Sequence, residues 1–367
     1  MSTDTNTINN SAQEMQNDLI GKKFFSRYEI KEKIYTGSEY TIYKSLNTNN
    51  NKEFAIKIKR KNESNCNINI TEENEVDSDD SYHEFNDTKF ENESYMLSML
   101  KGFGIPELYS FGYNSNYNLM IMELLGQSLN DLFKLKNKKF SLKTTCMLGI
   151  QMIDRIEYIH SLKIIHTNLK PNSFLLGKNS KSHILFLSDF GSARKYWMSN
   201  AHIKFSEGKT NFGSAKFLSW NALNGYELSR RDDLESIAYI IIYFLKGCFP
   251  WQGLKINNKE EKYKKICEIK NQITSKYLCK DLPEEFETFV EYVKKLEFTD
   301  VPNYSYLKDL LKKVIEKLGE QIDFWYDWCT EKPNILADDP IFTNDYKIEY
   351  NGSKEWLNTK KWREIYK

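Results

Sequence analysis

Residues 166–191 read HTNLKPNSFLLGKNSKSHILFLSDFG, and this stretch is central to the prediction of the fold. Its first part, 166–177, is a polar loop that follows a long helical pattern. Its last part is an apolar strand pattern at 183–187 that ends in Ser-Asp-Phe-Gly at 188–191. Each part is a weak signal alone, because Asp-Phe-Gly is a common tripeptide. The stretch therefore has to be interpreted together with the motifs on either side of it.

Two motifs precede this stretch, and four follow it. Before it, FAIK at 54–57 is a strand pattern that ends in Lys57, and Glu93 lies on a short helical pattern over 90–100. Glu91 remains an alternative to Glu93, because the register of that helix leaves both open. After it come FGSAKFLSWNA at 212–222, SRRDDLES at 229–236, FPWQGLK at 249–255 and PNYSYL at 302–307.

Composition excludes several classes of protein. The 367 residues are 40% hydrophobic and 14% aromatic, which is enough for a real core. Lys plus Arg at 52 against Asp plus Glu at 51 leaves a net charge of +1, so we expect no nucleic-acid partner. The longest apolar stretch, 237–245, is too short to span a membrane. The absence of a secretory signal and of any C-x-x-C pair predicts a cytoplasmic or nuclear protein with reduced thiols.

The periodicity of apolar residues changes along the chain. Strand patterns occur at 28–34, 40–44, 54–58 and 118–124, separated by polar turns. After Gly126 the patterns are helical, at 144–161, 232–246, 284–295 and 305–318. The sequence therefore predicts a small strand-rich part over 25–125 and a larger helical part over 126–330.

Three segments depart from this rhythm. Residues 1–24 are expected to be a disordered extension. Residues 62–88 carry nine acidic side chains and no Lys or Arg, and we expect a disordered insert. It is either a solvated insertion or a target for phosphorylation at Ser78 and Ser81. Residues 331–367 form a C-terminal extension with Trp356 and Trp362, which either packs on the domain or recruits a partner.

In this order and at these separations, the motifs resemble those of the protein kinases. The sequence resembles the casein kinase 1 family, to which the vaccinia-related kinases are a sister group, because Ser219-Trp220-Asn221 fits the Ser-x-Asn motif that replaces Ala-Pro-Glu there. The resemblance covers roughly 26–329, with the acidic segment as an insertion. It implies an α+β, bilobal protein-kinase fold, with a small antiparallel-sheet N-lobe that carries one helix and a larger, mainly helical C-lobe.

The resemblance implies a role for each charged motif residue in phosphoryl transfer, which depends on positioning and charge stabilisation. Lys57 would hold the α- and β-phosphates of ATP and pair with Glu93. Asp189 would hold Mg²⁺, and Lys170 would neutralise the transferring phosphoryl group.

The resemblance also implies an adenine site. Met122 would be the gatekeeper, and the hinge facing adenine would run from Glu123 to Leu125. Ala55 and Leu175 would lie on the two faces of the adenine ring.

The catalytic loop departs from the family pattern of His-Arg-Asp followed by an Mg²⁺-binding Asn. The corresponding residues are Thr167, Asn168 and Ser173. An amide oxygen accepts hydrogen bonds but takes no proton at neutral pH, so Asn168 is a degenerate base. The short, neutral hydroxyl of Ser173 would hold a second Mg²⁺ poorly.

The loop that covers the phosphates is also degenerate. The family pattern Gly-x-Gly-x-x-Gly falls on YTGSEY at 35–40, where only Gly37 remains. Glycine lets the backbone approach phosphates closely, and Tyr35, Tyr40 and the anionic Glu39 oppose this. Three losses across two loops predict a pseudokinase.

A second site is implied by resemblance to the anion-binding cations near the activation segment of casein kinase 1 relatives. Lys216 and Lys255 occupy the matching positions, with Arg230 and Arg231 in the neighbouring motif. The alternative is that these are ordinary surface lysines and a structural arginine pair. By the same resemblance, Asp233 should bond the backbone of the catalytic loop near His166.

The sequence thus predicts a catalytically impaired, monomeric kinase fold that regulates or scaffolds a protein partner, either a phosphorylated protein or an active kinase. Weak ATP binding with a single Mg²⁺ is one expectation, and a purely structural Lys57–Glu93 ion pair is the other. The rival hypothesis is an active serine/threonine kinase that transfers the γ-phosphate of ATP to acidic or primed substrates. A third is a nucleotide-responsive switch without phosphotransfer.

Overall fold

The computed structural model describes residues 19–61, 74–75, 88–209, 213, 215–333 and 335. The chain divides after Lys332 into two units, and the first unit contains all of the helices and strands named below. The expected acidic insert lies outside the described residues except at 74–75 and 88, as do Trp356 and Trp362. Among the helices described, none is long and apolar enough to cross a membrane.

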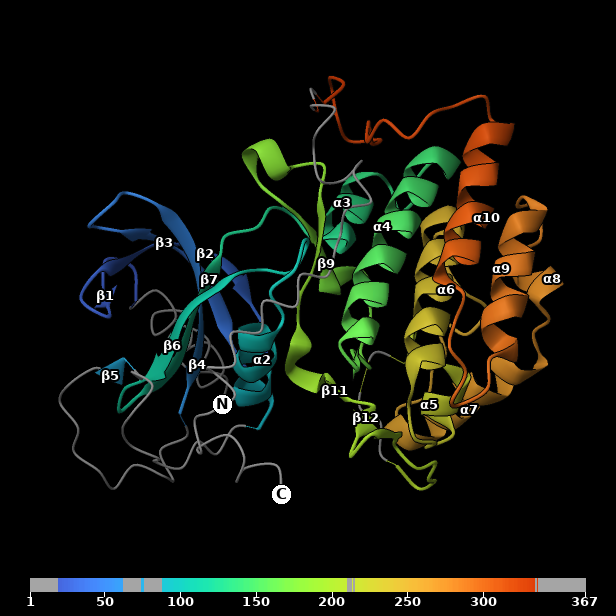
Figure 1. The fold of residues 1–367 in the computed structure, drawn as a ribbon, viewed down its shortest axis with the longest axis horizontal. Coiled ribbons are helices and arrows are strands. Elements are labelled where there is room, and N and C mark those ends of the chain that lie inside the picture. Colours follow the sequence, from blue (N-terminus) through green and yellow to red (C-terminus); the bar gives the residue numbers. More distant parts are fainter. Residues whose placement is uncertain are drawn as a thin grey trace, which may run out of the picture. The chain divides into compact units, whose positions relative to one another are not determined.

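The N-lobe is built on a sheet of seven strands in the order β1-β2-β3-β4-β7-β6-β5, in which all neighbours are antiparallel (Figure 1). The predicted antiparallel sheet is confirmed. The strands are β1 (Lys23–Phe24), β2 (Tyr28–Thr36), β3 (Thr41–Asn47), β4 (Glu53–Arg60), β5 (Asn74–Glu75), β6 (Leu108–Tyr113) and β7 (Tyr117–Glu123).

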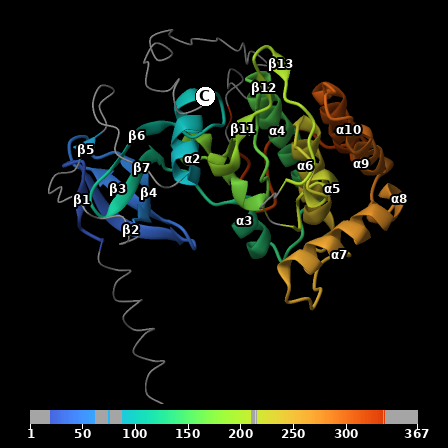
Figure 2. The same ribbon diagram turned by 90° about the horizontal axis from the view of Figure 1, so that it is seen from below.

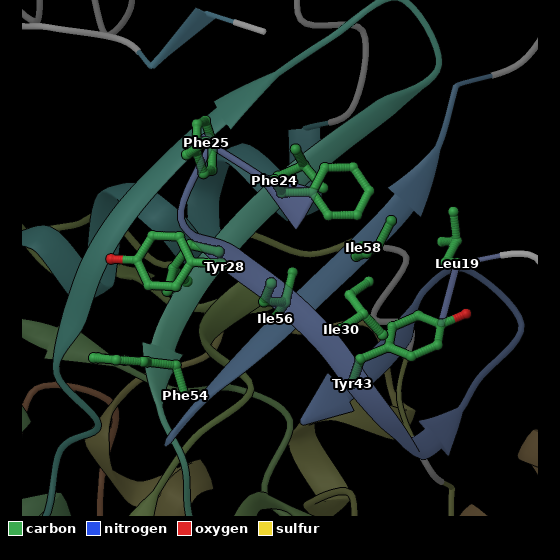
Figure 3. Packing of buried hydrophobic residues seen from close by; sticks show 11 residues of the cluster. Leu19, Phe24, Phe25, Tyr28, Ile30, Tyr43, Phe54, Ile56 and Ile58 are labelled. Atoms are coloured by element: carbon green, nitrogen blue, oxygen red, sulfur yellow. The ribbon is translucent and has the colours of Figure 1, made fainter. Parts of the chain in front are cut away.

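The side chains on the two faces of β4 have different surroundings, because successive side chains of a strand point to opposite faces of the sheet. Phe54, Ile56 and Ile58 pack into a hydrophobic cluster on one face of the sheet (Figure 3). Ala55 and Lys57 point to the other face. The alternation of β4 thus directs Lys57 away from this cluster and toward the helix α2 (Thr88–Met99).

The N-lobe begins earlier than the sequence predicted. Leu19 and Phe24 belong to the same cluster and are only 7% and 3% exposed (Figure 3). The expectation of a disordered extension over 1–24 is therefore wrong for residues 19–24. The reason is that these few apolar side chains, which have no periodic pattern, cover the open face of the sheet.

The C-lobe is mainly helical, as predicted. Its centre is α4 (Leu142–Ser161) against α6 (Arg230–Lys246), and α6 is buried along nearly its whole length. α6 begins with a capping box between Ser229 and Asp232 and ends at Gly247, whose φ is 80°. The other helices are α3 (Leu129–Leu135), α5 (Trp220–Leu223), α7 (Lys259–Gln272), α8 (Ser275–Leu278), α9 (Glu284–Lys295) and α10 (Tyr304–Lys317).

Short elements between α4 and α5 carry the motif residues. β8 (Ile164–Ile165) pairs with β11 (Arg194–Lys195), and β9 (Phe174–Leu176) pairs with β10 (Leu185–Leu187). A hairpin of β12 (Trp197–Met198) and β13 (Ala201–His202) follows. Single 3₁₀ turns are η2 (Pro171–Ser173), η3 (Asn179–Lys181) and η4 (Phe190–Ser192).

Candidate functional site

A buried ion pair joins the N-lobe sheet to α2. Lys57 Nζ lies 2.5 Å from Glu93 Oε2, and the two residues are 3% and 5% exposed. Burial alone would lower the pKa of Lys57, but the Glu93 carboxylate, together with Tyr40 and Asp189, outweighs it and raises this pKa. Glu93, and not Glu91, is thus the partner of Lys57.

The aromatic ring of Tyr40 covers this lysine. Tyr40 lies between β2 and β3, and its ring centroid is 3.6 Å from Lys57 Nζ, which is a close cation–π contact. Burial raises the pKa of the Tyr40 phenol to about 12, so the ring is neutral at physiological pH. The face of Lys57 that a phosphate would approach is therefore occupied by the chain itself.

The rest of the degenerate glycine loop supports this closed position. The ring of Tyr35 lies 5.9 Å from that of Tyr40. A Cβ at Gly37 would come within 3.0 Å of the Tyr35 ring, so even the remaining glycine faces a tyrosine. Glu39 lies 3.8 Å from Lys89 at the start of α2. The tip of the β2–β3 hairpin is thus drawn toward α2.

A small polar cavity of about 200 Å³ remains beneath the hairpin. Its lining includes Gly37, Asn168 and the charged residues Lys57, Glu93, Lys170 and Asp189. The residues predicted to hold adenine do not line it. Cations and carboxylates in this cavity are largely paired with each other, which reduces its attraction for a polyphosphate.

The residues predicted to hold Mg²⁺ offer few free oxygen ligands. The Asp189 carboxylate, on a residue with φ of 68°, lies 2.9 Å from Lys170 Nζ. The buried Ser173 hydroxyl donates to the backbone carbonyl of Asn168 at 3.3 Å. The described residues contain no group of three or more His, Cys, Asp or Glu suited to a metal ion. Ser173 thus supplies only a neutral, already bonded hydroxyl where the family pattern has the Mg²⁺-binding Asn, so these residues fit a second Mg²⁺ poorly.

Asp233 holds the catalytic loop, as predicted. Its carboxylate accepts hydrogen bonds from the backbone N–H of His166 at 2.7 Å and of Thr167 at 2.8 Å, and it lies 3.0 Å from His160 Nε2. Burial favours a higher pKa, but the hydrogen bonds and charges of His160 and His166 together outweigh it and lower the pKa of Asp233. Thr167 in turn donates its hydroxyl to the carbonyl of Ser192 at 2.8 Å. The loop therefore keeps its shape without the catalytic residues.

Asn92 is a site residue that the sequence did not indicate. Its side-chain amide donates to the carbonyls of Phe190, Gly191 and Ala193, at 3.3, 3.1 and 2.8 Å. It thereby ties α2 to η4, immediately after Asp189. Its position next to Glu93 was the only available signal.

The predicted adenine residues lie on both lobes. Ala55 and Met122 are cross-strand neighbours on β4 and β7, and Leu175 lies on β9. Ala55 is buried, whereas Met122, Leu125 and Leu175 are partly exposed. Glu123 forms an ion pair with Lys181 at 2.6 Å, which links the hinge to the C-lobe. The adenine role of these residues remains a prediction.

Lys216, the first predicted anion ligand, faces an aromatic ring. Its Nζ lies 3.2 Å from the centroid of the Tyr243 ring, and burial, with repulsion from Lys138, lowers the pKa of Lys216 to about 8. Lys255 is exposed, and its convergence with Lys216 remains a prediction.

The arginine pair is turned into the C-lobe. Arg230 is 6% exposed and donates to the Thr299 carbonyl at 2.7 Å and to the Tyr196 hydroxyl at 3.3 Å. The Arg231 guanidinium lies 5.6 Å from the Phe298 ring centroid. Both guanidinium groups thus contact the protein itself, and the expectation that Arg230 and Arg231 bind an anion remains a prediction.

A two-lobed fold with a strand lysine paired to a helix glutamate, and with Asp-Phe-Gly between the lobes, defines the protein-kinase class. A sequence model of the protein kinase domain matches residues 28–319, which is most of the chain. The chain therefore belongs to the protein kinase family, whose members use ATP and Mg²⁺.

Proposed function

We propose that this chain is a pseudokinase of the casein kinase 1 type, which binds a protein partner instead of transferring phosphate. One observation carries the proposal: the Tyr40 ring lies 3.6 Å from Lys57 Nζ, on the lysine expected to hold phosphates. A nucleotide would have to displace this contact, and a desolvated cation–π contact contributes about 2 kcal/mol.

The residues at the reacting end support the same conclusion. Asn168 cannot take the proton of a substrate hydroxyl, and loss of a general base typically costs on the order of 10²–10⁴ in rate. Lys170 already neutralises Asp189. What the chain retains, namely the Lys57–Glu93 ion pair and the Asp233 hydrogen bonds, stabilises the fold of a regulatory or scaffolding module.

A slow serine/threonine kinase is the second candidate, and the short Lys57–Glu93 and Lys170–Asp189 contacts favour it. Such an enzyme would bring ATP to the cavity after the β2–β3 hairpin opens, and would phosphorylate acidic or primed proteins. A switch that binds a nucleotide without transferring phosphate would need the same opening of the β2–β3 hairpin.

Transfer of radiolabel from ATP to an acidic protein tests the proposal. The acidic protein should incorporate no more label in the presence of the full chain than in the presence of the Asp189→Asn variant. ATP should raise the melting temperature only slightly, with little dependence on Mg²⁺. Incorporation well above that of Asp189→Asn would overturn the proposal, and a large Mg²⁺-dependent shift without incorporation would favour the switch.

A further inference from the structure

A tight hairpin projects from the segment after Asp-Phe-Gly. Figure 2 shows β12 and β13 side by side. In this pair of strands, Trp197 lies opposite His202 and Met198 opposite Ala201. The two turn residues, Ser199 and Asn200, have φ of 50° and 60°. Two positive φ values in a two-residue loop are the signature of a type I′ turn, whose twist matches that of the strands. The hairpin therefore has a defined conformation of its own.

Contacts with the C-lobe hold this hairpin in place. The buried Tyr196 donates its hydroxyl to the His160 carbonyl at 2.7 Å. Arg194 forms an ion pair with Glu227 at 2.6 Å. These two contacts fix both the residue before β12 and the start of β11 against the C-lobe.

The hairpin exposes an aromatic surface. Ring centroids lie 6.4 Å apart for Trp197 and His202, 4.7 Å for His202 and Phe298, and 5.3 Å for Phe298 and Phe205. The exposed members are Trp197 at 37%, Met198 at 54% and Phe205 at 47%. We call these three side chains the hairpin patch. Such a cluster on one surface is typical of an interaction site.

Three lysines lie at or near the patch. Lys163 Nζ lies 5.3 Å from the Trp197 ring centroid, and Lys195 and Lys204 are exposed within the hairpin segment. None of the three forms an ion pair with the described part of the chain. Within 194–209 there are four Lys or Arg and a single acidic residue, Glu207. Two of these four, Arg194 and Lys209, pair with Glu227, so the positive charge beside the patch comes from Lys163, Lys195 and Lys204.

We propose that the hairpin patch binds an acidic segment of a partner protein that carries aromatic side chains. The rigid rings of Trp197 and Phe205 offer apolar contact area, as in interface hot spots. Carboxylates of the partner complement Lys163, Lys195 and Lys204. Nucleic acid fits less well, because its affinity depends on neutralising many phosphates, which three lysines do not provide.

This inference specifies the binding role in the proposed function, but it uses no residue of the cavity beneath Tyr40. The two are therefore tested separately. Peptide binding reports on the patch, and radiolabel transfer by the same preparation reports on catalysis. If the peptide does not bind, the result of the radiolabel assay is unaffected, and the reverse is also true.

The experiment measures fluorescence polarisation of a labelled acidic peptide with two phenylalanines, titrated with the full chain. Two matched peptides have either glutamine in place of every acid or alanine in place of both phenylalanines. The acidic aromatic peptide should bind about tenfold more tightly than either, and added salt should weaken its binding. Equal affinity for the glutamine peptide would overturn the proposal, as would tighter binding of a labelled oligouridine to the patch.

Variants locate the site. Trp197→Ala, and separately Lys195→Glu with Lys204→Glu, should each weaken binding about tenfold. Trp325→Ala and Lys276→Glu, at exposed positions outside the patch, are the matched controls and should leave it unchanged. Unchanged affinity in the patch variants overturns the proposal. Melting temperatures check folding, and the exposed lysine pair keeps the test decisive if Trp197→Ala is unstable.

Discussion

Tyr40 determines at the scale of one residue whether Lys57 can meet a phosphate. Its ring contacts the ammonium group directly, and its partial burial raises the pKa of the phenol to about 12. An active kinase has glycine in this place, with no side chain to remove. The Tyr40 ring thus contacts the Lys57 ammonium group at the position that the phosphates of a nucleotide would occupy.

Tyr40→Ala should therefore increase the effect of ATP on stability. A ligand that binds only the folded state raises the melting temperature according to its concentration relative to Kd. At millimolar ATP we expect a clearly larger shift in Tyr40→Ala than in the unmodified chain, measured by differential scanning fluorimetry. Tyr109→Ala, which removes an exposed tyrosine elsewhere in the sheet, is the control. Equal shifts in all three proteins would show that Tyr40 does not block the site.

Lys270 predicts a pH dependence of stability. It is 2% exposed, donates to the Leu218 carbonyl at 2.5 Å, and lies against the rings of Tyr239 and Trp251. Burial lowers its pKa from 10.5 to about 7. Between these values the unfolded chain binds more protons, so the free energy of unfolding should rise with pH from about 7 to about 10.5.

Each unit of pKa difference corresponds to about 1.4 kcal/mol, so Lys270→Met should remove a measurable part of this slope. Chemical denaturation at several pH values in this window provides the measurement, with the exposed Lys276→Met as control. An unchanged slope in Lys270→Met would mean that the folded protein holds this lysine charged.

At the scale of elements, β4 and α2 depend on each other through one buried ion pair. Lys57→Met should lower the free energy of unfolding by about 3–5 kcal/mol, because it leaves the Glu93 carboxylate buried without a partner. The double variant Lys57→Met with Glu93→Leu should recover much of this loss. Denaturant unfolding of the four proteins in the cycle measures the coupling. Additive losses would contradict the prediction.

Asn92 connects α2 to η4 by hydrogen bonds alone. Asn92→Ala leaves the carbonyls of Phe190, Gly191 and Ala193 without this donor and should cost about 1–3 kcal/mol. Ser98→Ala, at an exposed position on the same helix, should change stability little, since its hydroxyl bonds only within α2. Thermal unfolding compares the two, and similar small losses would show that the Asn92 contacts contribute nothing.

At the scale of the whole molecule, the sequence was informative wherever burial is periodic. The strands β2, β3, β4 and β7 and the helices α4, α6, α9 and α10 follow from such patterns, whereas β1, β5 and β6 were not predicted, and the order of the motifs predicted the kinase fold. Residues 19–24 were misjudged because a few apolar side chains in a polar segment show no period. Only their packing on β2 and β4 reveals them as part of the core.

Side-chain direction was the other limit of the sequence. Sequence position placed Arg230 and Arg231 beside the predicted anion ligands. It did not show that their guanidinium groups point into the C-lobe. It placed Tyr40 in the phosphate loop without showing its contact with Lys57. These features depend on side-chain rotamers and on neighbours that are distant in the sequence. A single amino-acid sequence does not reveal either of them.

The buried ion pair of Lys57 also affects how a mutant organism would be interpreted. Replacing this lysine is the usual genetic test of whether a kinase needs its activity. In this protein the same allele would lower the amount of folded product, since a loss of a few kcal/mol changes cellular abundance. A phenotype of Lys57→Met would then report missing protein rather than missing catalysis. An allele at the partly exposed Asp189 would separate the two.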